Sequence, residues 1–203
     1  AIVASQPFGG EGLSGTGPKA GGPHYLPRFA AVTAEPRPAA QGPEADPAAV
    51  QAALDAARPD RLRVLETLDM PGPTGESNRL RLFPRGVLLC LGPDAAALEE
   101  QRAMARQAGC VPVAVAPGAS GSLSVDGRLA PERLTTLAGF DVVALWGDEA
   151  AQRAARRALA ARDGPILPLV TAPGMKGLCV LERHLCIDTT ASGGNAALLA
   201  EHA

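Results

Sequence analysis

Few residues of this 203-residue chain have the types and spacing that catalysis requires. The three histidines are far apart in the sequence and show no metal-ligand spacing: His24, His184 and His202. On a strand, His184 and Cys186 would share one face, which raises the idea of a thiol–imidazole pair. Their alternation with apolar residues favours one face of a half-exposed strand instead. The glycine-rich stretch 8–17 lacks the lysine and the strand context of a phosphate-binding loop.

The four cysteines lack the CxxC spacing of a zinc site. Three of them have apolar neighbours in the sequence: Cys90, Cys179 and Cys186. We therefore expect buried, reduced cysteines, as in a cytoplasmic protein.

Composition excludes several classes of function. The formal net charge is −2, which argues against a nucleic-acid binder with a basic stripe. No apolar run approaches the ~20 residues of a membrane span. The opening Ala-Ile-Val has neither the basic start nor the apolar stretch of a signal peptide. We expect a cytoplasmic chain without a membrane span.

Between residues 60 and 170, short apolar runs alternate with alanine-rich amphipathic stretches. The runs predict strands and the stretches predict helices. Strands alternating with helices imply right-handed crossovers and a mostly parallel sheet, so the fold class is α/β and Rossmann-like. The predicted strands are 86–91, 111–116, 141–146 and 166–170, and the predicted helices are 47–57, 94–107, 131–137 and 148–162.

The segments around this domain have little to bury. Residues 1–29 are glycine-dense and 30–46 are rich in proline and alanine, which indicates an extended linker. We place the domain at 47–188, with 177–189 as an extended arm or a hairpin, and a small-residue tail at 189–203. Residues 1–45 should be mobile or held by a partner.

Both ends of the chain carry long motifs rich in small residues. Residues 6–23 (Gln-Pro-Phe-Gly-Gly-Glu-Gly-Leu-Ser-Gly-Thr-Gly-Pro-Lys-Ala-Gly-Gly-Pro) are similar to the closing stretch of the L-glutamate γ-semialdehyde dehydrogenase module in the proline utilization A (PutA) family. Residues 188–196 (Asp-Thr-Thr-Ala-Ser-Gly-Gly-Asn-Ala) resemble the C-terminal motif of its longer members. The resemblance implies a cytoplasmic parent, which can associate peripherally with the membrane. An FAD-dependent module oxidises proline there, and an NAD-dependent module oxidises the semialdehyde, which reaches it through an internal channel.

The resemblance also implies roles for individual residues in the intact parent. Ala1 would end the loop whose amides hold the substrate carboxylate, and Phe8 would form one wall of the aldehyde site. The tail would support the channel or the aldehyde site through Thr189, Thr190, Gly193, Gly194 and Asn195. The partner implied is the remainder of the parent chain, and homo-oligomerisation stays open.

The middle domain resembles the NAD-binding half of an aldehyde dehydrogenase, but it departs from that family where chemistry is done. Asp94 stands in place of the oxyanion-hole asparagine, where a carboxylate repels the developing charge. Val115 and Ala116 replace the ribose-binding lysine, and Asp148 brings negative charge to the pyrophosphate position. The general-base glutamate is replaced within residues 171–174. We therefore expect no catalytic residue and no bound cofactor in this chain.

These observations favour a structural function. The domain would be a catalytically silent lid that covers the substrate channel of the parent and supports its semialdehyde dehydrogenase site. The alternative is an autonomous nucleotide-binding or regulatory module that senses NAD(H) in the inherited crevice.

Overall fold

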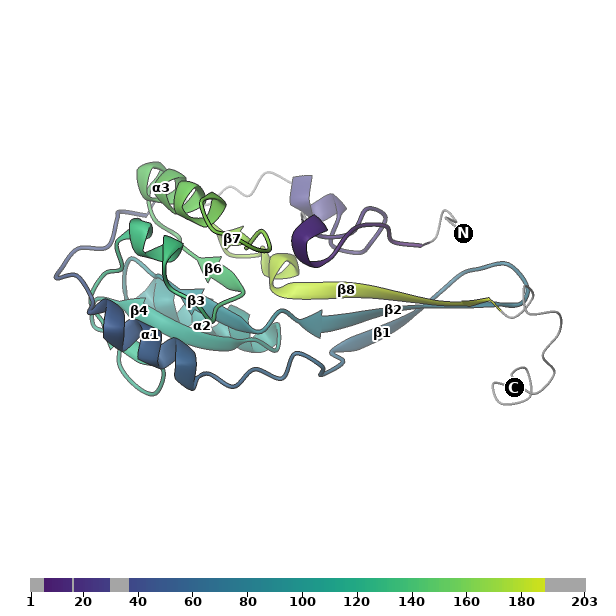
Figure 1. The fold of residues 1–203 in the computed structure, drawn as a ribbon, viewed down its shortest axis with the longest axis horizontal. Coiled ribbons are helices and arrows are strands. Elements are labelled where there is room, and N and C mark those ends of the chain that lie inside the picture. Colours follow the sequence, from purple (N-terminus) through teal and green to yellow (C-terminus); the bar gives the residue numbers. More distant parts are fainter. Residues whose placement is uncertain (1–5, 16, 30–36, 189–203) are drawn as a thin grey trace.

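The computed structural model describes residues 6–15, 17–29 and 37–188. Within them, a five-stranded parallel sheet forms the centre of an α/β body (Figure 1). Its order is β5-β4-β3-β6-β7, which is 3-2-1-4-5 when its strands are counted along the chain. That order is typical of a doubly wound nucleotide-binding fold, as the sequence predicts. The strands are β3 (Val87–Cys90), β4 (Val111–Ala116), β5 (Ser124–Asp126), β6 (Val142–Ala144) and β7 (Leu169–Val170).

Helices cover both faces of this sheet. Helices α1 (Pro47–Ala56) and α3 (Glu149–Ala160) pack on one face, and α2 (Ala95–Gln107) packs on the other. Successive strand residues point to opposite faces, so Val87 and Leu89 of β3 join one core cluster while Leu88 joins the other. Each of these three helices begins and ends within two residues of its predicted bounds.

Several predicted elements are shorter than expected. Strand β6 covers Val142–Ala144, where 141–146 was predicted. The stretch 131–137 forms only the 3₁₀ helix η3 (Pro131–Thr135). Strand β7 begins at Leu169 rather than at residue 166, because Pro165 and Pro168 have no N–H to donate to a ladder. The remaining 3₁₀ helices are η1 (Gly12–Ser14), η2 (Leu26–Phe29) and η4 (Lys176–Cys179).

A second, antiparallel sheet projects from the body as a long flap (Figure 1). Its order is β1-β2-β8, from β1 (Glu66–Met70), β2 (Glu76–Pro84) and β8 (Val180–Asp188). The sequence analysis did not predict β1 or β2. The predicted arm is β8, and it pairs along β2 from Glu76↔Asp188 to Pro84↔Val180 instead of folding on itself.

All four cysteines are free thiols. Cys90, Cys110 and Cys179 are buried, but Cys186 is exposed, so its predicted burial is wrong. Cys186 lies near the end of β8, opposite Asn78 of β2, and β8 runs away from the α/β body (Figure 1). No helix of the described chain is long and apolar enough to cross a membrane.

Candidate functional site

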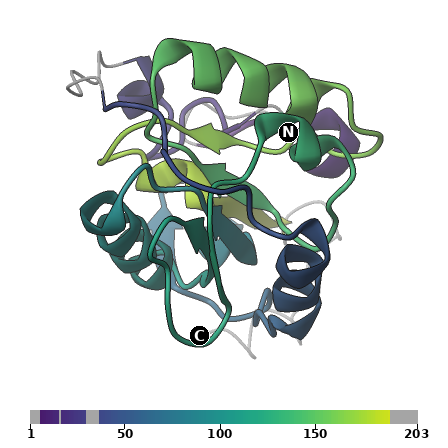
Figure 2. The ribbon, with the colours of Figure 1, turned by 90° about the vertical axis from the view of Figure 1, so that its left-hand side faces the viewer.

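The carboxyl ends of the parallel strands are where a doubly wound sheet binds its ligand. The strand order reverses between β3 and β6, so the crevice lies between the turns that follow these two strands. Residues 92–94 form the first turn and residues 145–148 form the second. Figure 2 views the molecule from the side of Figure 1 toward which these strands run.

The two carboxylates in this crevice cap helices. Asp94 accepts a hydrogen bond from the backbone N–H of Ala97 at 2.8 Å, and Asp148 accepts one from Ala151 at 2.8 Å. Each carboxylate therefore satisfies a free N–H at a helix N-terminus, where a cofactor phosphate would otherwise bind. Val115 and Ala116 are at most 1% exposed and belong to the core, so neither side chain can reach a ribose.

A segment of the chain itself crosses this crevice. Residues 37–46, which we name the strap, run over the ends of the strands toward α1 (Figure 2). The guanidinium carbon of Arg37 lies 5.5 Å from the ring centroid of Trp146, which follows β6. Arg37 also forms ion pairs with Asp94 at 4.0 Å and with Glu100 at 3.1 Å. Arg37 thus connects both turns of the crevice at the point where the strand order reverses.

The rest of the strap is fixed beside β5. Arg128 donates its backbone N–H to Pro43 O and accepts from Ala45 N, both at 2.9 Å. Ala45 is only 2% exposed and belongs to the core. A Cβ added at Gly42 would be 3.7 Å from Pro117, so the strap is in contact with the turn after β4. The described part of the predicted linker is therefore extended but packed against the domain.

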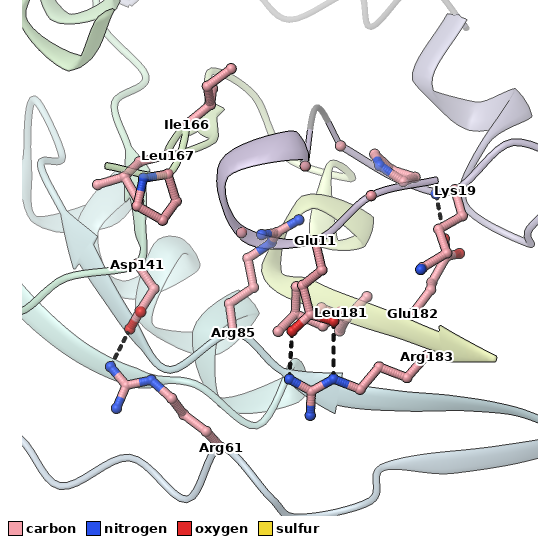
Figure 3. A pocket seen from close by; sticks show the side chains of 17 residues that line it. Glu11, Lys19, Arg61, Arg85, Asp141, Ile166, Leu167, Leu181, Glu182 and Arg183 are labelled. Atoms are coloured by element: carbon pink, nitrogen blue, oxygen red, sulfur yellow. Dashed lines mark hydrogen bonds and ion pairs between the residues drawn. The ribbon is translucent and has the colours of Figure 1, made fainter. Parts of the chain in front are cut away.

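A cavity of about 250 Å³ lies at the opposite, amino ends of the strands (Figure 3). It lies between the N-terminal segment, residues 6–29, the start of β8 and the residues that precede β6 and β7. Its charged lining residues are Glu11, Lys19, Arg61, Arg85, Asp141, Glu182 and Arg183.

Ion pairs fix most of these charges. Glu11 receives two hydrogen bonds from Arg183, at 2.6 and 3.1 Å, and these bonds hold the pKa of Glu11 below its ordinary value. Arg61 donates to Asp141 at 2.8 Å. Asp141 also accepts from the backbone N–H of Val87 at 2.7 Å, which ties it to the start of β3.

Glu182 holds the N-terminal segment on the flap. Its side chain is 5% exposed and accepts hydrogen bonds from the backbone N–H groups of Lys19, at 2.6 Å, and of His24, at 3.4 Å. Gly22 lies so close that an added Cβ would be 2.8 Å from Glu182 Oε1, so a larger residue there would force the Glu182 carboxylate to move. The sequence left this segment without a partner within the chain, and the structure places it against β8.

Phe8 is the one predicted site residue among those that the structure describes. Phe8 is 65% exposed and forms an isolated bridge with Ala20. Ala1 and the tail residues Thr189, Thr190, Gly193, Gly194 and Asn195 lie outside the described residues. His184 and Cys186 share a face of β8, as expected, but no hydrogen bond joins them among the described residues. The described chain also holds no cluster of three or more metal-ligating side chains.

Sequence reasoning missed Arg37, Arg85 and Glu182. A glutamate after Val180 and Leu181 on an apolar strand was a detectable signal, because a buried carboxylate needs donors. Nothing in the spacing of Arg37 or Arg85 pointed to their partners.

Fold and crevice together define an α/β domain of the doubly wound class whose ligand crevice is crossed by its own chain. No family model matches the sequence. The chain is 35% identical to the bifunctional protein PutA of Escherichia coli strain K12, over 98% of this chain and 18% of that protein. The chain is also 35% identical to the bifunctional protein PutA of Rhizobium meliloti, over 98% of this chain and 19% of that protein. A solved structure of bifunctional proline utilization A is 30% identical, with a TM-score of 0.43, over 51% of this chain and 13% of that one.

The chain is thus a segment of a PutA-type protein, and it spans about a fifth of the length of the curated relatives.

Proposed function

We propose that this chain belongs to a bifunctional enzyme that converts proline to glutamate, and that its α/β domain is a non-catalytic lid over the substrate channel. The observation that carries the non-catalytic role is the position of Arg37 between Asp94 and Trp146. A dinucleotide in this fold would need that place for its phosphates and ribose. The residues present do not fit NAD, because two carboxylates already use the helix N-termini and the strap fills the crevice. NAD and FAD would act in the other modules of the parent.

Exposed apolar side chains support a docking role. They gather on the N-terminal segment: Phe8, Leu13, Leu26 and Phe29 are each at least 65% exposed. Apolar groups clustered in this way mark interaction surfaces. In the intact parent, the semialdehyde dehydrogenase module would cover them. Ala1 and Phe8 would then contribute to its substrate site, and the tail residues 189–196 would support that site or the channel.

A pair of leucines allows a matched test of the lid. Leu26 and Leu62 are both 78% exposed, but only Leu26 lies on the N-terminal segment. In the full-length parent, we expect Leu26→Asp to release semialdehyde to a trapping reagent during proline turnover, whereas Leu62→Asp should not. Equal trapping by the two variants would remove the support for the lid.

The tail requires a separate experiment. A parent that lacks residues 189–203 should fold but oxidise the aldehyde poorly or lose channelling. Full coupled activity in that truncated parent would contradict the role of the tail.

The sensor alternative depends on one observation, the retained strand order 3-2-1-4-5. Trp146 is the single tryptophan of the chain and lies in the crevice, so its fluorescence would report a bound nucleotide. We expect no saturable change with NAD or NADH up to about millimolar concentration, since the strap must first be displaced. Micromolar binding would favour the sensor and overturn the non-catalytic interpretation of the crevice.

A further inference from the structure

The cavity at the amino ends of the strands has an unbalanced set of charges. Four cationic side chains line it, from Lys19, Arg61, Arg85 and Arg183, against three carboxylates, from Glu11, Asp141 and Glu182. Two arginine–carboxylate pairs account for four of these groups. Glu182 is satisfied by backbone N–H groups, and Lys19 Nζ donates to Gly9 O at 2.8 Å.

Besides Lys19, whose Nζ donates to a backbone carbonyl, Arg85 is the cation of this cavity without a carboxylate partner in the described part of the chain. Its Nε donates to Leu178 O at 2.7 Å, and its backbone N–H donates to Cys179 O at 3.0 Å. These two bonds orient the side chain, which extends toward the N-terminal segment (Figure 3). Its two Nη groups have no hydrogen bond or ion pair with a described residue. Burial lowers the pKa of Arg85, yet a guanidinium stays protonated in a protein at neutral pH.

Such an arginine has a defined ligand preference. A guanidinium presents parallel N–H groups in a rigid fork that matches the two oxygens of a carboxylate. The cavity also has an apolar part of its wall, formed by Ile166, Leu167, Val180 and Leu181. We propose that this cavity binds a small monocarboxylate with a short apolar body, whose carboxylate is received by Arg85 and whose body lies against these side chains.

The charge and the volume of the cavity limit the class of ligand further. The lining carries one net positive charge, from four cations against three carboxylates, so it balances a monoanion, whereas a dianion would leave an uncompensated negative charge. The volume of about 250 Å³ is smaller than pockets for drug-sized ligands, which begin at about 300 Å³. The site is distinct from the strap-covered crevice, which lies at the other end of the same strands.

The test uses the 203-residue chain and a pair of isosteric probes. In a ligand-observed NMR titration at constant ionic strength, 3-methylbutanoate should bind saturably with a dissociation constant in about the millimolar range. Its uncharged isostere, 3-methylbutanamide, should bind at least about tenfold more weakly, because it lacks the charge-assisted fork. Inorganic phosphate should bind no better than the amide. Equal affinity of acid and amide, tighter binding of phosphate, or no saturable binding of the acid would overturn the proposal.

Three variants locate the site. Arg85→Gln should weaken 3-methylbutanoate binding at least about tenfold, and Arg156→Gln, an exposed change of the same charge on α3, should leave it unchanged. Because Arg85 also bonds to Leu178, loss of folding in Arg85→Gln is an outcome to control. Leu181→Trp fills the cavity without a change of charge, and it should abolish binding. Wild-type affinity in Leu181→Trp, or in folded Arg85→Gln, would exclude this cavity as the site.

Discussion

At the scale of single residues, the same side chains that would oppose NAD binding have structural roles. Asp94 and Asp148 are the caps of α2 and α3, and each accepts a backbone N–H from the first turn of its helix. The departures from an active dehydrogenase therefore stabilise the domain as it stands. A carboxylate at a helix N-terminus is favoured both by the hydrogen bond and by the helix dipole.

Replacement of Asp148 tests this role. Asp148→Ala should lower the free energy of unfolding by about 1 kcal/mol, because the N–H of Ala151 loses its partner. Asp148→Asn can still accept that bond, and it should retain most of the stability. Urea denaturation of the three proteins measures both effects. A stability of Asp148→Ala equal to the wild type would show that the cap contributes nothing.

Glu182 gives a second residue-scale prediction. Glu182→Ala removes the acceptor of Lys19 N and His24 N, so residues 17–24 should loosen from β8. Hydrogen bonds to a charged group contribute about 1.5–3 kcal/mol, so exchange of the Lys19 amide should accelerate at least about tenfold. Glu99→Ala, a change at an exposed position of α2, is the control. Slow exchange of Lys19 in Glu182→Ala would mean that other contacts hold this segment.

At the scale of elements, the strap is the feature that crosses the carboxyl ends of the parallel strands. It links the turns after β3 and β6 through Arg37 and pairs with the residues beside β5 through Arg128. A loop that follows the ends of parallel strands satisfies its own backbone groups there and excludes other ligands. In the proposed function, the strap takes the place of a nucleotide.

Removal of Arg37 should open this contact. In Arg37→Ala, acrylamide should quench the fluorescence of Trp146 more strongly, and its emission should shift to longer wavelength. The loss of stability should stay at or below about 2 kcal/mol, since the ion pairs are partly exposed and a cation–π contact contributes about 0.5–1 kcal/mol. Arg153→Ala, which breaks an ion pair on α3, should leave the fluorescence unchanged. Identical quenching in both variants would place the strap away from the ring.

At the scale of the whole molecule, burial divides the thiols into two classes. The three cysteines of the α/β body are buried, and Cys186 on the flap is exposed. Burial disfavours the thiolate, which raises the pKa of Cys179 to about 12 and also raises the pKa values of Cys90 and Cys110. A thiol reagent should therefore modify one cysteine in the native protein and four in urea.

These raised pKa values also set how stability depends on pH. Unfolded thiols lose their protons near pH 8.5, whereas the buried ones keep them, so above about pH 8.5 the unfolded state binds fewer protons. The free energy of unfolding should then fall as pH rises, by up to about 1.4 kcal/mol per pH unit for each buried thiol. Urea midpoints at about pH 8 and pH 10 measure the slope. Cys179→Ala should reduce this slope and Cys186→Ser should not. A slope that Cys179→Ala leaves unchanged would show that other groups cause the pH dependence.

The sequence by itself determined the α/β elements of the domain. Apolar runs, alanine-rich amphipathic stretches and capping aspartates are local signals, and strands β3, β4 and β6 and helices α1, α2 and α3 were found where these signals lie. Charged β2 was missed, although Arg79-Leu80-Arg81-Leu82 alternates with the period of a strand.

Only the tertiary structure decided which distant residues meet. Lys19 and Glu182 are 163 positions apart, and no local pattern predicts their hydrogen bond. Arg37 looked like one more charge in a proline-rich linker until the fold brought Asp94 and Trp146 to the same crevice. Arg85 lines a cavity without an ion pair among the described residues because the carboxylates of Asp141 and Glu11 pair with Arg61 and Arg183. The physical reason is that periodicity and capping act within a few residues, whereas pairing of charges depends on which elements pack together.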